Sequence, residues 1–165
     1  MSQSISEKVK DKINEDLSPT KNLTGLHLKI VAAIAIIWSL FQLWYASPFP
    51  FIFNFGMFKG LPARAIHLGF ALTLAFLIYP ISKGKKISVF DILISIVGAF
   101  SCFYIYFFYD QLVDRGGVLL NISIGDYFKL PIELMIGSIG ILTLLEATRR
   151  AIGLPLVIIA ICFLL

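Results

Sequence analysis

The chain has 165 residues, of which 58% are hydrophobic and 15% are charged, and its mean hydropathy is +0.88. In soluble domains about a quarter of the residues are charged, and a soluble domain of this size cannot bury this much apolar surface. The composition therefore excludes a free water-soluble domain. The formal net charge of +4 does not indicate a nucleic-acid partner, because the basic residues stand in short groups between apolar runs, as membrane topology requires.

The first 28 residues are polar and carry both signs of charge. Ser4 and Glu7 have the spacing of a capping box, and apolar residues then recur at every fourth position. This pattern predicts a short amphipathic helix on the membrane surface, with an unstructured tail as the alternative. We therefore interpret residues 1–28 as a cytoplasmic amphipathic tail.

Four apolar segments with the length of a membrane span follow the tail. We predict spans at 30–46, 62–80, 87–109 and from 127 or 131 to 147. The phenylalanine-rich stretch 48–58 is too short and too rich in proline to span, so it is predicted to be an interfacial or re-entrant hairpin, and 110–126 is predicted to be a polar loop. Residues 29–151 thus form a predicted four-span small membrane domain.

A last apolar run occupies residues 152–165. Its proline-led part corresponds to about 16 Å of helix, whereas the hydrocarbon core of a membrane is about 30 Å thick. We interpret this run as the start of a connecting helix to a missing large domain. The predicted fold class is therefore all-α: an integral membrane four-helix bundle with an N-terminal amphipathic helix and a truncated fifth helix.

Basic residues in the loops predict the orientation. With the N-terminus in the cytoplasm, ten basic residues lie inside and four lie outside, in agreement with the positive-inside rule. The inside set is Lys8, Lys10, Lys12, Lys21, Lys29, Lys83, Lys85, Lys86, Arg149 and Arg150, and the outside set is Lys59, Arg64, Arg115 and Lys129.

The sequence offers little material for a metal centre or a hydrolase. His27 and His67 fall on opposite membrane faces, and Cys102 and Cys162 lie inside apolar runs, where cysteine usually packs as a small residue. The nucleophile-elbow, zinc-protease and phosphate-loop motifs are absent from the sequence. We therefore predict no catalytic residue, no cofactor and no metal.

Five charged residues at the ends of the predicted spans have structural explanations. They are the candidate caps and ion-pair residues Asp91, Glu133, Glu146, Arg149 and Arg150. Asp91 follows Ser88 by three positions, as in a helix N-terminal cap. Glu133 sits in the first turn of a helix starting at Pro131, where the helix dipole favours an acid, and can pair with Lys129. Glu146 can pair with Arg149 or Arg150 near a helix C-terminus, where cations are favoured. A functional role for these acids is the alternative, because an ionisable group within a span is a candidate by default.

Arg64 and His67 are the candidate partner or lipid contacts. Arg64 is a cation at the N-terminal end of its predicted helix, which the dipole disfavours, and His67 lies one turn deeper on the same face. A compensating acid from a partner or a lipid phosphate is therefore expected. The alternative is that Arg64 extends to the head groups while His67 is satisfied inside the bundle.

Three stretches resemble one known family. They are Arg64-Ala-Ile-His67-Leu-Gly-Phe running to Leu77-Ile-Tyr-Pro80, then Asp91, then Leu145-Glu-Ala-Thr-Arg-Arg150-Ala-Ile-Gly-Leu-Pro-Leu156. Together they are similar to the N-terminal part of fused permeases of tripartite ATP-independent periplasmic (TRAP) transporters, especially of the TAXI-associated type. The resemblance covers about residues 28–165.

The resemblance implies a function. In that family a small four-helix part acts as a fixed scaffold beside a large twelve-span part, which moves substrate and sodium as an elevator, and a soluble periplasmic protein delivers the substrate, often a carboxylate. The expected function is therefore that of a scaffold domain of a sodium-coupled transporter in the bacterial inner membrane, not an enzyme. Its expected partners are the large domain, the periplasmic binding protein and lipids. The alternative is a small membrane-embedded enzyme or assembly factor that uses Arg64, His67 and Glu133.

Overall fold

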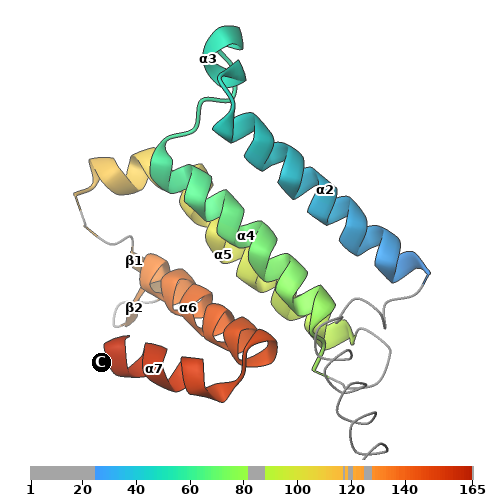
Figure 1. Cartoon of the computed structure of the whole chain (residues 1–165). Coiled ribbons are helices and arrows are strands. Elements are labelled where there is room, and N and C mark those ends of the chain that lie inside the picture. Colours follow the sequence, from blue (N-terminus) through green and yellow to red (C-terminus); the bar gives the residue numbers. More distant parts are fainter. Residues whose placement is uncertain (1–24, 82–87, 117, 119–120, 125–127, 165) are drawn as a thin grey trace, which may run out of the picture.

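The computed structural model of the chain describes residues 25–81, 88–116, 118, 121–124 and 128–164 (Figure 1). These residues are mostly helical. The helices are α2 (Leu26–Ala46), α3 (Phe49–Phe53), α4 (Gly60–Ile78), α5 (Val89–Asp114), α6 (Ile132–Ala151) and α7 (Leu154–Leu164), and two short strands are β1 (Asn121–Ile124) and β2 (Phe128–Pro131). The tail predicted at residues 1–28 lies almost entirely outside the described residues.

Three of these helices, α2, α4 and α5, are long and apolar enough to cross a membrane. The fourth predicted span corresponds to α6, which has 20 residues and is therefore about 30 Å long. It carries a glutamate in its first turn and two arginines in its last turn, so its charges lie toward the two ends and its middle is apolar.

The helices form a layered arrangement with α4 and α5 at its centre (Figure 1). The core cluster consists of Leu72 and Phe76 from α4, Cys102 from α5 and Ala147 from α6. Small residues allow these helices to approach closely: a Cβ built on Gly69 would lie 3.4 Å from Phe103, and one built on Gly98 would lie 3.4 Å from Thr143 Oγ1. On α6, Gly137 has open space around it.

Helix α2 packs on α4 and also contacts the short helix α3 (Figure 1). Its contact with α4 consists of Val31 against Leu74 and Leu77, with Trp38 at the edge of the cluster. The remaining faces of α2 expose large apolar side chains such as Leu40 and Leu43. Such a surface is stable in hydrocarbon but not in water, which suits a helix at the rim of a membrane domain.

The phenylalanine-rich stretch after α2 forms the five-residue helix α3 and a turn. The turn uses left-handed backbone at Asn54 and Gly56. A Cβ built on Gly56 would lie 2.8 Å from Trp44 Nε1, so the indole of Trp44 occupies the space that a side chain would need. The segment predicted to be an interfacial hairpin is therefore a short helix and a turn that pack against the indole of Trp44.

Helix α5 runs farther than the sequence predicted. The predicted third span ended at Tyr109, but the helix continues to Asp114 and is capped at Arg115. The predicted polar loop is therefore wrong over residues 110–114. Farther along, β1 pairs antiparallel with β2, so the alternative start of the fourth span at 127 is wrong, and the helix begins at Ile132, next to the alternative start at 131. The first polar residues mark the end of the apolar stretch of α5, but the helix itself continues beyond them.

The last apolar run forms α7, which packs back against α6 (Figure 1). The reversal occurs at Gly153, whose φ of 112° is disfavoured for residues with a side chain. Val157 is the buried contact of α7. The two helices therefore form a pair joined by a tight turn.

Candidate functional site

A charged cluster lies where α4 ends, α5 begins and α6 ends. It consists of Asp91, Glu146, Arg149 and Arg150, which we call the charge network. Arg150 Nη1 lies 2.6 Å from Asp91 Oδ1, and the exposed fractions of the two side chains are 4% and 0%. Removing one partner of an ion pair that is this completely buried strongly destabilises the folded protein, because the other charge stays buried and unpaired. The network therefore holds α5 against α6.

Asp91 occupies its position because the local sequence caps α5. Ser88 and Asp91 form a capping box: Asp91 Oδ2 accepts a hydrogen bond from the Ser88 backbone N–H at 3.1 Å. Its other oxygen accepts from the Ile81 backbone N–H at 3.2 Å in addition to Arg150. One carboxylate therefore joins the segment after α4, the start of α5 and the end of α6.

Arg150 is held by acids and an aromatic ring together. Its Nε donates to Glu146 Oε1 at 2.8 Å, and its guanidinium carbon lies 5.0 Å from the centre of the Phe76 ring, in range of a cation–π interaction. Arg149 binds the same Glu146 with two hydrogen bonds of 2.7 Å but stays exposed. Glu146 thus fixes both arginines, and only Arg150 is drawn into the core.

The opposite end of the helices carries two further ion pairs. Lys59 pairs with Asp110, and this hydrogen bond and charge raise the pKa of the exposed Lys59 amine above its ordinary value. Arg115 Nη1 lies 2.6 Å from Glu133 Oε1, with the glutamate side chain only 6% exposed. This second pair joins the end of α5 to the start of α6. The side chain of Lys129, the partner predicted for Glu133, lies outside the described residues.

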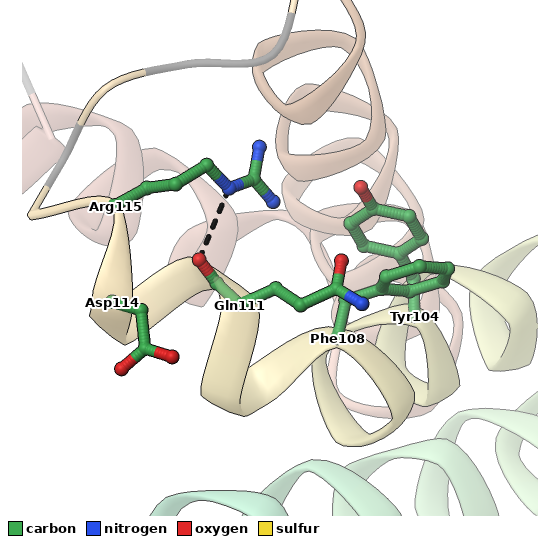
Figure 2. A pocket seen from close by; sticks show the side chains of 5 residues that line it. All are labelled: Tyr104, Phe108, Gln111, Asp114 and Arg115. Atoms are coloured by element: carbon green, nitrogen blue, oxygen red, sulfur yellow. Dashed lines mark hydrogen bonds between the residues drawn. The ribbon is translucent and has the colours of Figure 1, made fainter.

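A hollow of about 430 Å³ lies at the end of α5. Figure 2 shows its lining residues, Tyr104, Phe108, Gln111, Asp114 and Arg115, all on α5 or its cap. Arg115 Nε donates to the Gln111 carbonyl oxygen at 3.0 Å, while its guanidinium also pairs with Glu133. Arg115 is therefore engaged at this helix end, and no group of three metal-ligating side chains occurs in the described part of the chain.

Arg64 and His67 lie on the exposed side of α4. His67 Nδ1 lies 3.4 Å from the donor Trp38 Nε1 and 2.9 Å from Gln42 Nε2, both on α2. The imidazole therefore contributes to the α2–α4 contact. Within the described residues no acidic side chain pairs with Arg64, and no hydrogen bond or ion pair joins Arg64 or His67 to Glu133.

Sequence reasoning found the members of the charge network but missed its central contact. The spacing indicated the Ser88–Asp91 cap and the pairing of Glu146 with Arg149 or Arg150, which are local. It did not indicate the pair between Asp91 and Arg150, which are 59 positions apart. The sequence did contain one signal for this pair: an acid and a cation are predicted at the same membrane depth, where each is costly to leave unpaired.

A comparison of the chain with protein-family models, with curated proteins and with solved structures found no match.

Proposed function

We propose that this chain is the scaffold domain of a sodium-coupled transporter of the tripartite ATP-independent periplasmic type, which braces a larger transport domain during uptake of a carboxylate. One observation supports the proposal most strongly. Two of the three stretches that carry the resemblance contribute to the charge network, with Asp91 as the second and Glu146 with Arg150 from the third. Phe76, which lies between the two quoted blocks of the first stretch, contacts Arg150. Residues far apart in sequence thus serve one structural purpose, the rigid joining of three helices.

A scaffold must resist the forces that a moving partner exerts. Helices α4, α5 and α6 share a core, and ion pairs join α5 to α6 at both ends, through Asp91 with Arg150 and through Glu133 with Arg115. Polar side chains within the helices are also satisfied locally, as when Thr143 donates to the Ile139 carbonyl at 2.9 Å. This arrangement favours a fixed element over a moving one.

The proposed scaffold is a four-span bundle of α2, α4, α5 and α6 in the bacterial inner membrane with a cytoplasmic N-terminus. The charge network then lies at the cytoplasmic face and the pairs Lys59–Asp110 and Arg115–Glu133 at the outer face. The basic residues of the loops support this orientation, and the charged ends of α6 fit a helix whose termini reach the two interfaces.

We also propose that the chain has no catalytic role of its own. The alternative, an enzyme using Arg64, His67 and Glu133, requires these groups to converge on one reacting atom. His67 instead contacts Trp38 and Gln42, and Glu133 pairs with Arg115. The described contacts of these residues therefore support packing and not acid–base chemistry.

Reconstitution in liposomes tests the proposal. The chain would be combined with the large membrane protein and the soluble binding protein encoded beside it, and uptake of radiolabelled carboxylates would be followed under an inward sodium gradient. We expect uptake with all three components and none when any one is omitted or when potassium replaces sodium.

Two results would contradict the proposal. Uptake or hydrolysis by the chain alone would identify it as a working transporter or enzyme. Full uptake by the large protein and the binding protein without this chain would show that no scaffold is needed.

A further inference from the structure

We propose that the N-terminal end of α4 binds the head group of a net-anionic phospholipid through Arg64, with His67 as a second donor. We call Arg64 and His67 the head-group site. The proposal concerns the chain by itself and does not depend on the transport function proposed above.

Arg64 is a cation for which the described residues provide no counter-charge. It is the fifth residue of α4, so it lies about 6 Å along the axis from the helix start. Its neighbours Ala63 and Ala65 are buried, whereas Arg64 is exposed. Within the described residues the nearby acid Asp110 pairs with Lys59, and no acid pairs with Arg64. An anion from outside the chain would balance the charge of Arg64, and the helix dipole also favours negative charge near the N-terminus of α4.

His67 provides a hydrogen-bond donor because of its contacts with α2. Trp38 Nε1 points its hydrogen at His67 Nδ1 across 3.4 Å, and an indole nitrogen can only donate. Nδ1 must therefore carry a lone pair, which places the proton of the neutral ring on Nε2. The amide of Gln42 at 2.9 Å can donate to the same Nδ1. The Nε2–H is the ring donor that these contacts leave unused, on an exposed side chain.

The two donors match the order of groups in a glycerophospholipid. Residues three apart lie on one helix face, and here they are separated by about 4.5 Å along the axis. With α4 crossing the membrane, Arg64, which is nearer the helix start, would reach the phosphate, and His67, which is deeper, would reach an ester carbonyl. Leu61 and Leu68 are exposed on the same helix and provide apolar surface for an acyl chain.

Charge complementarity selects the lipid class. Arg64 adds a full positive charge to the positive end of the α4 dipole, so a head group with its own cation gains less there than one with net negative charge. Phosphatidylglycerol is therefore expected to bind better than phosphatidylcholine. A carboxylate on a partner helix would satisfy Arg64 alone and leave the His67 donor and the apolar surface unexplained.

Native mass spectrometry of the purified full chain in mild detergent tests this site. The chain would be titrated with phosphatidylglycerol or phosphatidylcholine, and lipid adducts would be counted for the wild type, Arg64→Gln, Arg64→Lys and Lys29→Gln. Lys29 is an exposed lysine at the other end of the adjacent helix α2, so Lys29→Gln is the charge-matched control. We expect Arg64→Gln to weaken phosphatidylglycerol binding about tenfold, which corresponds to about 1.4 kcal/mol, and Lys29→Gln and Arg64→Lys to weaken it about twofold or less.

The same experiment can overturn the proposal. If Arg64→Gln binds phosphatidylglycerol as well as the wild type does, the anion at Arg64 is not a lipid, and a partner carboxylate replaces it. If Lys29→Gln loses as much binding as Arg64→Gln, the attraction is general and no site exists. If the wild type binds phosphatidylcholine equally well, the selection by net charge is wrong. Arg64→Lys is the control for misfolding, because it changes the side chain but keeps the positive charge. If it retains binding, the loss in Arg64→Gln comes from the missing charge and not from a disturbed fold.

Discussion

At the scale of single residues, the molecule places its most buried charges where three helices meet. Asp91 has no exposed surface, and its charge is balanced by Arg150 and by two backbone N–H groups. A carboxylate with this many donors is stable when buried, whereas a lone one would be very costly. The pair is therefore important for stability mainly because removing one of its members would leave the other charge buried and unpaired.

Asp91→Asn is expected to destabilise the folded chain by about 3–5 kcal/mol, because it leaves the Arg150 charge buried without its main partner. The measurement is the unfolding midpoint of the purified chain in detergent, followed by intrinsic fluorescence. The double variant Asp91→Asn with Arg150→Met should recover part of this loss, since it removes the unpaired buried cation while the introduced amide oxygen can still accept from one of the two backbone N–H groups that Asp91 binds.

Arg149→Gln is the matched control for this prediction. Arg149 binds the same Glu146 but is exposed, and exposed ion pairs contribute little, so its unfolding midpoint should stay close to that of the wild type. If Asp91→Asn proved as mild as Arg149→Gln, the charge network would not join the helices in the way described.

At the scale of elements, helix contacts depend on residues without large side chains. Gly98 on α5 faces Leu72 on α4 and Thr143 on α6, with a built Cβ already at 3.4 Å from the threonine hydroxyl oxygen. Any side chain larger than a methyl group would extend into this three-helix contact. Overpacking of a filled core costs about 1–3 kcal/mol.

Gly98→Leu should therefore lower the unfolding midpoint markedly, whereas Gly137→Leu should not. Both glycines lie in apolar helices, but Gly137 has no heavy atom near a built Cβ. The comparison uses the same fluorescence measurement, with insertion into membranes checked by extraction with alkaline carbonate. Equal effects of the two substitutions would mean that the helix propensity of glycine, and not the contact, controls stability.

The ends of elements show why local patterns predicted some boundaries and missed others. The cap of α5 at Ser88 and Asp91 was visible in the sequence because a capping box is local. The extension of α5 to Asp114 was not visible, because Asp110, Gln111 and Asp114 give this segment the polarity of a loop, although it is compatible with a helix. Lys59 and Glu133, which belong to other elements, contribute ion pairs to Asp110 and Arg115 at that helix end.

At the scale of the whole molecule, the orientation rests on the distribution of charge. Reporter fusions after Lys86 and after Arg150 are expected to report cytoplasm, and a fusion within residues 112–117 is expected to report periplasm. Alkaline phosphatase and green fluorescent protein activities of the same fusion points provide the measurement, since each is active on one side only. The reverse pattern at all three points would invert the proposed orientation and move the charge network to the outer face.

The sequence by itself determined the membrane class, the long helices and the start of α4 to within about two residues, and it left the start of α6 open between 127 and 131, because hydropathy, proline and caps act over short distances. It also indicated that Arg64 has no local acid. Only the tertiary structure decided that α2 packs on α4, that Glu133 pairs with Arg115, and that Asp91 meets Arg150. The physical reason is that lipid offers no hydrophobic preference for one helix face over another. Small-residue contacts and buried charge pairs therefore decide which helices pack together. Neither produces a periodic pattern in the sequence.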